Sequence, residues 1–146
     1  MSLNKFKTFI KLPLKKKIVV LEALFWLPVM KIIIQFVPMR VYTPVFLGRV
    51  SVESSKTVIE DNIELFENMR WALNVISNKM PWKKKCFALA MAAKMMLRYR
   101  KITTTLYLGI SKKDMNSFGA HAWLRAGNFY VTGGDGSGYT VISYFT

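Results

Sequence analysis

Residues 81–99 of this 146-residue chain read PWKKKCFALAMAAKMMLRY, and this stretch predicts the helix around which the fold is built. The run after Cys86 consists of strong helix formers, and Pro81 fits just ahead of a helix but poorly inside one. We therefore expect Cys86 in the first turn of a helix, where unpaired backbone N–H groups and the positive end of the dipole favour a thiolate over a thiol. Ala90 and Ala93 share the helical face of Cys86, so this face can pack closely into a core.

Cys86 is the only cysteine of the chain, and the stretch around it allows two interpretations. A lone cysteine commonly serves as a small buried hydrophobe. The alternative is a catalytic nucleophile, which the three lysines at 83–85 would favour by stabilising its thiolate. The stretch alone leaves both interpretations open.

The counts of cysteine and histidine limit the chemistry of the protein. One cysteine excludes an intrachain disulfide and a Cys-based zinc cluster, and one histidine, His121, excludes a multi-histidine metal site within the chain. We therefore expect no metal and no cofactor. Any cysteine–histidine chemistry within the chain must combine Cys86 with His121. A single cysteine also fits a reducing compartment, so we expect a cytoplasmic protein.

The chain carries a formal charge of +14, from 22 basic and 8 acidic residues. Such an excess predicts an anionic partner, which can be nucleic acid, a lipid surface or an acidic peptide. No RNA-binding signature accompanies the lysines, so we expect no nucleic acid partner. A basic protein without such a partner remains an alternative.

Residues 18–37, IVVLEALFWLPVMKIIIQFV, are long enough to cross a bilayer. However, Glu22, Lys31 and Gln35 are costly at membrane depth, and Pro28 interrupts the run. No small-residue cleavage site follows, which argues against a secretory signal. We expect an apolar helix that packs on the domain. The basic start of the chain leaves open a peripheral contact with an anionic membrane surface.

The rest of the sequence predicts a second helix and then strands. Prolines and a glycine interrupt residues 38–50, which we expect to form a loop or a short extended segment. Apolar residues at three- and four-residue steps predict an amphipathic helix over residues 56–77. β-Branched and alternating segments then predict strands at residues 103–110, 120–126, 128–132 and 139–145.

The order of these elements indicates the fold class. Residues 111–119 predict a polar loop, and Gly127-Asn128 is a hairpin turn signal. Helices followed by an antiparallel sheet indicate an α+β protein. We expect one domain overall, with a basic and apolar helical segment (1–55) that packs on a core formed by residues 56–146.

Three residues of this order can act together as a nucleophile, a base and an orienting acid. Cys86 begins a helix, His121 lies in a predicted strand, and Asp135 follows the next strand in a glycine-rich loop. A thiol nucleophile needs a base to take its proton, and the base needs an acceptor that holds its tautomer. Adjacent antiparallel strands would bring His121 and Asp135 close together. Asp114 is the rival acid, but it precedes His121 and lies in a predicted loop.

The sequence resembles a known family along most of its length, from about residue 15 onward. Cys86 is followed by FALAMAAKMMLRYRKI, then by TTTLYLGI at 103–110 and AHAW at 120–123, and a V-P-M-R turn stands near residue 38. This arrangement resembles the transglutaminase-like cysteine proteases of lasso peptide biosynthesis. These are leader peptidases, encoded in many clusters as a separate chain that forms the protease half of the B protein.

This resemblance implies a papain-like fold of the transglutaminase type and removal of the leader peptide from a ribosomally made precursor. It implies that Cys86 is the nucleophile, His121 the general base and acid, and Asp135 the orienting residue. No glutamine stands a few residues before Cys86, where papain-type enzymes carry an oxyanion donor. The backbone N–H of Cys86 and a group near Trp82 are the candidate substitutes.

The resemblance also implies partners. A separate leader-recognition (RRE) protein would present the lasso precursor peptide, and a cyclase resembling asparagine synthetase would close the ring. Two other functions remain open: an acyl transferase on the same fold, and a non-enzymatic basic scaffold on a membrane surface in which Cys86 is merely buried.

Overall fold

The structure, a computed structural model, describes residues 11–57, 60–82, 86–114 and 117–146. Its helical elements come first in the chain: α2 (Leu14–Phe36), α3 (Met39–Tyr42), the π-helix η1 (Thr43–Leu47), the 3-10 helix η2 (Glu60–Asn62), α4 (Ile63–Ser77) and α5 (Cys86–Arg98). The strands follow: β1 (Thr105–Asp114), β2 (Ser117–Ala126), β3 (Phe129–Thr132) and β4 (Thr140–Phe145). The predicted α+β order, with helices before an antiparallel sheet, is confirmed.

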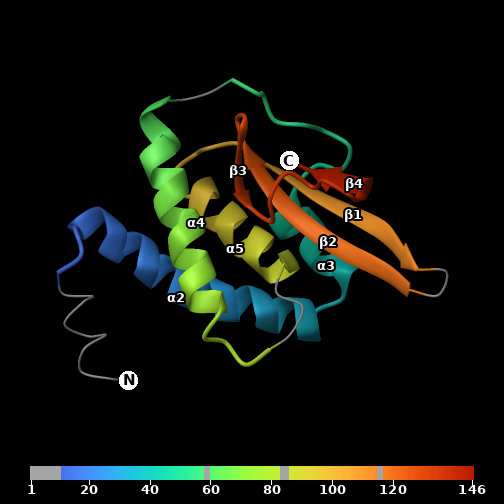
Figure 1. The fold of residues 1–146 in the computed structure, drawn as a ribbon, viewed down its shortest axis with the longest axis horizontal. Coiled ribbons are helices and arrows are strands. Elements are labelled where there is room, and N and C mark those ends of the chain that lie inside the picture. The colour runs from blue at the N-terminus through green and yellow to red at the C-terminus, as the bar shows by residue number, and fades with distance from the viewer. Residues whose placement is uncertain (1–10, 58–59, 83–85, 115–116) are drawn as a thin grey trace.

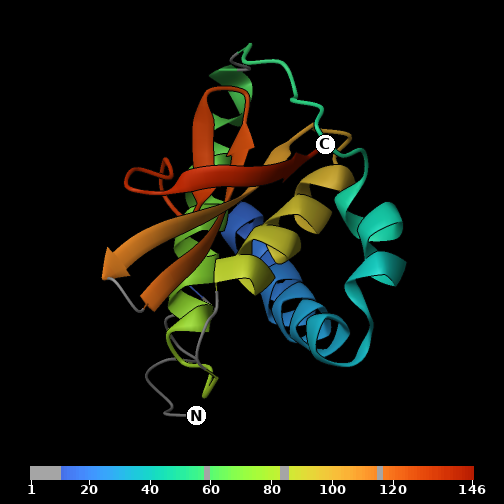
Figure 2. The same cartoon turned by 90° about the vertical axis from the view of Figure 1, so that its right-hand side faces the viewer.

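The strands within the described residues form one antiparallel sheet in the order β3-β2-β1-β4. The predicted hairpin turn between β2 and β3 is confirmed, and Gly127 adopts a φ of 58° there. Helix α5 packs against β2 and β3 on one side and against α2 on the other. Figure 2 shows this layering, with α5 between the sheet and α2. The helix that begins at Cys86 is therefore the central element of the fold (Figure 1).

Helix α5 owes its central place to small and flexible apolar side chains. Every residue from Ala90 to Leu97 is buried, including three alanines and three methionines. Alanines let neighbouring backbones approach closely, while methionines fill irregular gaps. Helix α2 contributes one stripe to this core, at helical spacing: Val19, Ala23, Leu27 and Met30.

Helix α2 is long and apolar enough to cross a membrane, judged by length and composition alone. One of its stripes packs on α4 and α5. Much of the remaining helix surface exposes large apolar side chains: Leu14, Ile18, Leu21, Leu24, Phe25, Ile32 and Phe36. The helix therefore has two apolar sides. One is buried in the core, and the other is exposed at the surface of the described protein.

The prediction that residues 38–50 form a loop or extended segment is wrong, because α3 and η1 occupy most of this range. Pro38 stands just before the first turn of α3, and Pro44 lies in the first turn of η1. At both positions the missing N–H of proline is tolerated. Gly48, with a φ of 85°, ends the helical path.

The predicted helix over residues 56–77 begins later than expected, at Ile63 after η2. Val58 and Ile59, which contributed to its apolar pattern, lie outside the described residues. The chain just before is held by the sheet: Ser54 N donates to Thr105 Oγ1 over 2.8 Å, and the Ser54 carbonyl accepts from Arg125 Nη2 over 3.1 Å. These long-range bonds hold the chain against the sheet before η2 and α4 begin.

The polar loop predicted over residues 111–119 is also shorter than expected. Strand β1 continues to Asp114 and β2 already starts at Ser117, so only residues 115–116, outside the described residues, separate them. Backbone pairing along the hairpin extends both strands into polar sequence, which side-chain patterns do not reveal.

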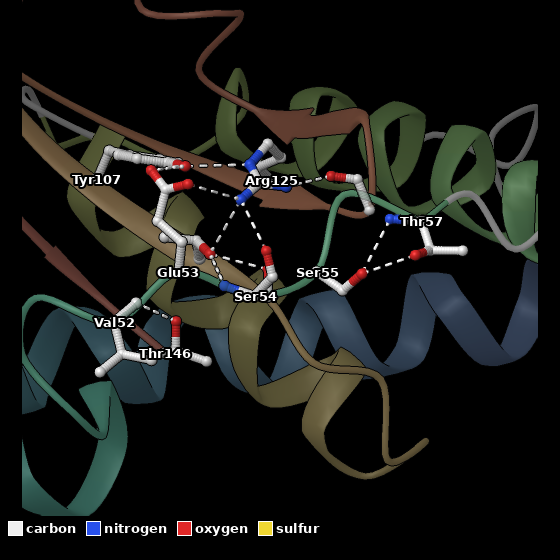
Figure 3. Close-up of polar contacts among 10 residues, drawn as sticks. Val52, Glu53, Ser54, Ser55, Thr57, Tyr107, Arg125 and Thr146 are labelled. Atoms are coloured by element: carbon white, nitrogen blue, oxygen red, sulfur yellow. Dashed lines mark hydrogen bonds and ion pairs between the residues drawn. The ribbon is translucent and has the colours of Figure 1, made fainter.

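Arg125 ties segment 50–57 to the sheet (Figure 3). Its side chain is 3% exposed, and its Nε donates to Tyr107 Oη over 3.0 Å. Tyr107 Oη in turn donates to Glu53 Oε1 over 2.9 Å, and Glu53 forms an ion pair with Arg125 at 3.6 Å. Since Leu106 and Leu124 point into the helical core, strand alternation puts Tyr107 and Arg125 on the opposite face of the sheet.

Candidate active site

Cys86 is the first residue of α5, which confirms the prediction that it lies in the first turn of a helix. Its thiol is free and half-buried, and its side chain packs against the core. Helix α5 packs on β2, and its N-terminal end lies beside that strand in Figures 1 and 2. The lysines at 83–85, expected to favour the thiolate, lie outside the described residues. The helix terminus itself supplies N–H groups and a positive dipole end next to the thiol.

His121 lies in β2, opposite Gly109 of β1, and its ring is half-buried. Its Nε2 is 2.7 Å from the carbonyl oxygen of Gly133. A carbonyl can only accept, so Nε2 carries a hydrogen in this bond. The ring also contacts Tyr139 and Trp123, with centroid distances of 4.7 and 5.9 Å. These contacts fix the plane of the ring, and in the neutral tautomer they leave Nδ1 as the proton acceptor.

The glycine-rich loop after β3 lies directly on the indole ring of Trp123. A Cβ built on Gly136 would be 2.4 Å from Cζ2 of Trp123, and one built on Gly133 would be 2.5 Å from the Ala122 carbonyl oxygen. Gly133 and Gly136 also have φ values of 77° and 76°, which side chains other than glycine rarely adopt. A Cβ on Gly109 of β1 would likewise be 2.8 Å from the Trp123 ring. Trp123 is therefore the platform that positions the loop beside His121.

Asp135 lies in the same loop, two residues after Gly133, and is exposed. Its Oδ1 accepts hydrogen bonds from the Ser137 hydroxyl, over 2.6 Å, and from the Ser137 backbone N–H, over 2.9 Å. The Ser137 hydroxyl, and then its backbone N–H, hold the pKa of Asp135 below its usual value. The structure thus brings the loop of Asp135 to His121, but the hydrogen bond to the imidazole comes from Gly133 and not from the carboxylate.

The rival acid, Asp114, ends β1 and pairs with Ser117 where the β1–β2 hairpin begins. It lies five residues along β1 from Gly109, the partner of His121 in the register. Its backbone position is therefore at the far end of the hairpin from the Gly133 hydrogen bond.

Trp82 has a buried indole Nε1 without a hydrogen-bond partner in the described part of the chain. Its ring packs against the core. Leaving a buried donor unpaired costs about 1–3 kcal/mol, so such groups are rare without a reason. This donor belongs to a residue four positions before Cys86.

Two contributors to this site carried no usable signal in the sequence. The acceptor for His121 is a backbone carbonyl, at Gly133, which no side-chain pattern reveals. Tyr139 follows the glycine-rich loop and looked like the start of a strand. The alternation of His121 and Trp123 in β2, by contrast, predicted their common face correctly. This face lies away from α5, because Ala122 and Leu124 on the other face are in the core with that helix, so the contacts of the described residues do not join His121 to Cys86.

Comparison with known proteins gives one match. Residues 40–144 match the family model of the transglutaminase-like superfamily. This range covers well over half of the chain and includes Cys86, His121 and Asp135, whereas α2 precedes it. No curated protein and no solved structure matches the chain. Among the described residues, no group of three or more histidine, cysteine or acidic side chains could hold a metal ion.

Proposed function

Because the chain belongs to the transglutaminase-like superfamily, we propose that it is a cysteine peptidase with Cys86 as its nucleophile. One observation carries the proposal. Cys86 begins α5, and His121 lies in β2, the strand on which α5 packs; the His121 ring itself lies on the face of the sheet away from α5, where its Nε2 is held and Nδ1 is its proton acceptor. A cysteine and a histidine on two packed elements are the parts that thiol catalysis requires.

The reaction follows from these parts. Nδ1 of His121 takes the proton of the Cys86 thiol, and the thiolate attacks the scissile carbonyl carbon. The tetrahedral intermediate collapses to a thioester as His121 returns the proton to the leaving amine. Water, deprotonated by the same nitrogen, then hydrolyses the thioester. Asp135 is assigned as the orienting residue, and it acts on His121 through the loop that also carries Gly133.

The negative oxygen of each tetrahedral intermediate needs hydrogen-bond donors. We assign this role to the backbone N–H of Cys86 and to Nε1 of Trp82. The buried Nε1, unpaired in the described part of the chain, supports this assignment because a ligand oxygen would supply its missing acceptor.

The proposed substrate is the leader region of a ribosomally made lasso precursor peptide. The resemblance around Cys86 and His121 to leader peptidases supports this class. The same resemblance supports two partners: a separate leader-recognition protein, and a cyclase resembling asparagine synthetase. A charge of +14 on this chain favours capture of an acidic peptide or partner.

We place the protein in the cytoplasm, with a peripheral contact between α2 and an anionic membrane surface. The uncovered side of α2 supports this contact because it exposes Leu21, Phe25 and Phe36. Lys15 and Lys16 add positive charge at the start of the same helix, where Lys15 pairs with Glu64 and Lys16 lies over the Trp71 ring.

The experiment is cleavage of a purified lasso precursor, followed by mass spectrometry, with and without the leader-recognition protein and across a salt series. We expect slow cleavage by the isolated chain, a large acceleration by the partner, and weaker acceleration at high salt because exposed charges are screened. Rapid cleavage that ignores both partner and salt would contradict the partner proposal. Transfer of the acyl group to an added amine in preference to water would identify an acyl transferase instead.

A further inference from the structure

A second site lies at the opposite end of α5 from Cys86. A cavity of about 380 Å³ opens between η1, the end of α5 and the residues that lead into β1. With a rise of about 1.5 Å per residue, α5 separates Cys86 from Arg98 on this cavity's wall by about 18 Å. The cavity is therefore distinct from the candidate active site.

The cavity is strongly basic. Four basic side chains line it: Arg49, Lys94, Arg98 and Lys101. No acidic side chain lines it in the part of the chain that the structure describes. The ion pairs among the described residues use other cations: Lys15, Arg100 and Arg125. The positive charge of the cavity is thus uncompensated by side chains of the described protein.

Lys94 is the most informative of these residues because it is only 6% exposed. The Nζ of Lys94 lies 3.4 Å from the carbonyl oxygen of Thr104 and 3.5 Å from the Oγ1 of Thr104. Both are long contacts to neutral oxygens. A buried ammonium without a negative partner is costly. Burial, and then the charge of Arg98, lower the pKa of Lys94 to about 8. A methionine, like its neighbour Met95, would fill the same space without this cost.

The surrounding basic residues are held in place at the rim. Arg98 Nη1 donates to the carbonyl oxygen of Val45 over 2.6 Å, which fixes the guanidinium beside η1. Lys101 adopts a φ of 57° after the end of α5, a conformation usually left to glycine. The negative end of the helix dipole explains cations near the end of α5 but not Lys94, which is buried a turn earlier.

We propose that this cavity binds a phosphate monoester, with Lys94, Arg98 and Lys101 as the ligands of the phosphate. Several cations around one space match a dianion better than a single carboxylate. The volume is at the lower end of that of small-molecule pockets, so it holds more than the bare ion. The organic part would lie on the apolar wall formed by Phe46 and Ile102. This inference does not depend on the proposed peptidase activity.

The test measures binding of three probes to the full chain: inorganic phosphate, adenosine monophosphate, and vesicles containing phosphatidic acid. We expect saturable binding of adenosine monophosphate that inorganic phosphate displaces. Lys94→Met and Arg98→Gln should each weaken it about tenfold or more, since each removes a charged donor. Lys56→Met, an exposed residue outside the cavity with the same change in charge, should leave it unaltered.

The outcomes separate the sources of phosphate. Binding of phosphatidic acid vesicles alone, lost in Lys94→Met and Arg98→Gln, would support the phosphate site and assign it to a lipid headgroup. Absence of saturable binding of all three probes would overturn the proposal. So would binding that Lys56→Met weakens as much as Lys94→Met, because that result indicates net charge alone. Arg98 is exposed, so its variant keeps the test valid even if a change at buried Lys94 disturbs folding.

Discussion

Nε2 of His121 donates a 2.7 Å hydrogen bond to the carbonyl oxygen of Gly133, on a loop that rests against the indole ring of Trp123. The orientation of the candidate general base therefore depends on a backbone atom. The position of that atom depends in turn on glycines that let the loop approach the ring. Substitutions in this loop are therefore expected to change the orientation of His121.

The first prediction compares two glycines of this loop. Gly134 and Gly136 both have a positive φ, 70° and 76°, so alanine is strained at either position. Only Gly136 faces Trp123 at 2.4 Å, whereas a Cβ on Gly134 meets nothing within 4 Å. We expect Gly134→Ala to lower the free energy of unfolding by about 1 kcal/mol. Gly136→Ala should lower it by about 2–4 kcal/mol and also reduce cleavage, because the loop must move off the ring. Equal effects in urea unfolding and in cleavage rate would show that the Trp123 contact is unimportant.

The second prediction concerns how Asp135 acts. Asp135→Ala should slow cleavage less than loss of Cys86 or His121, because water can partly replace an orienting acid. Asp135→Asn removes the charge but can still accept from Ser137, while Ser137→Ala removes the Ser137 hydroxyl bond and keeps the charge. If the charge matters, Asp135→Asn will be slow and Ser137→Ala close to wild type in steady-state cleavage.

The control for this pair is Asp114→Ala. An inactive Asp114→Ala together with a fully active Asp135→Ala would show that the triad is wrongly assigned. The register distance between Asp114 and Gly109 leads us to expect the reverse.

The third prediction tests the buried indole. Trp82→Phe removes the Nε1 donor and keeps most of the apolar ring. If this donor binds the oxyanion, kcat should fall about 100- to 1000-fold. Thermal stability should not fall comparably, since the substitution also removes a buried donor that has no partner among the described residues. Trp71→Phe, at a ring that is 42% exposed on α4, is the matched control. A kcat for Trp82→Phe equal to that control would exclude the role.

The fourth prediction follows from Lys94, whose pKa falls from 10.5 to about 8 on folding through burial and the nearby Arg98. Between these values the unfolded chain binds more protons than the folded one, so stability from this group rises as the pH rises from about 8 to 10.5. Lys94→Met should lose this rise, and Lys56→Met should keep it. The measurement is the free energy of unfolding in urea at several pH values. Identical pH dependence in Lys94→Met and wild type would contradict the assignment.

The helix at Cys86, the hairpin at Gly127 and the α+β order could be predicted from the sequence because local propensity and packing agree there. Segment 50–57 could not, since long-range bonds from Arg125 and Thr105 override its local pattern. The helices between residues 38 and 48 were hidden by prolines that occupy tolerated first-turn positions.

The residues of the candidate site also differ in whether the sequence alone reveals them. Cys86 and His121 could be singled out because each is the only residue of its type. The Gly133 carbonyl could not, because it is a backbone atom. A group near Trp82 was a candidate from the sequence, but the burial of its Nε1, without a partner in the described part of the chain, could not be predicted. From the sequence, Lys94 is an ordinary polar residue of a helix. The structure shows that Lys94 and its neighbours in α5 are buried.

The central claim is that His121 activates Cys86, and the most direct measurement is the rate of Cys86 alkylation by iodoacetamide across pH. Cys86 is the only cysteine, so the label reports one residue. The account predicts fast alkylation of wild type below pH 7, at least about tenfold slower alkylation of His121→Ala there, and none of Cys86→Ala. Circular dichroism confirms that each variant is folded. Slow alkylation with the same pH dependence in wild type and His121→Ala would contradict the account and identify Cys86 as a structural residue.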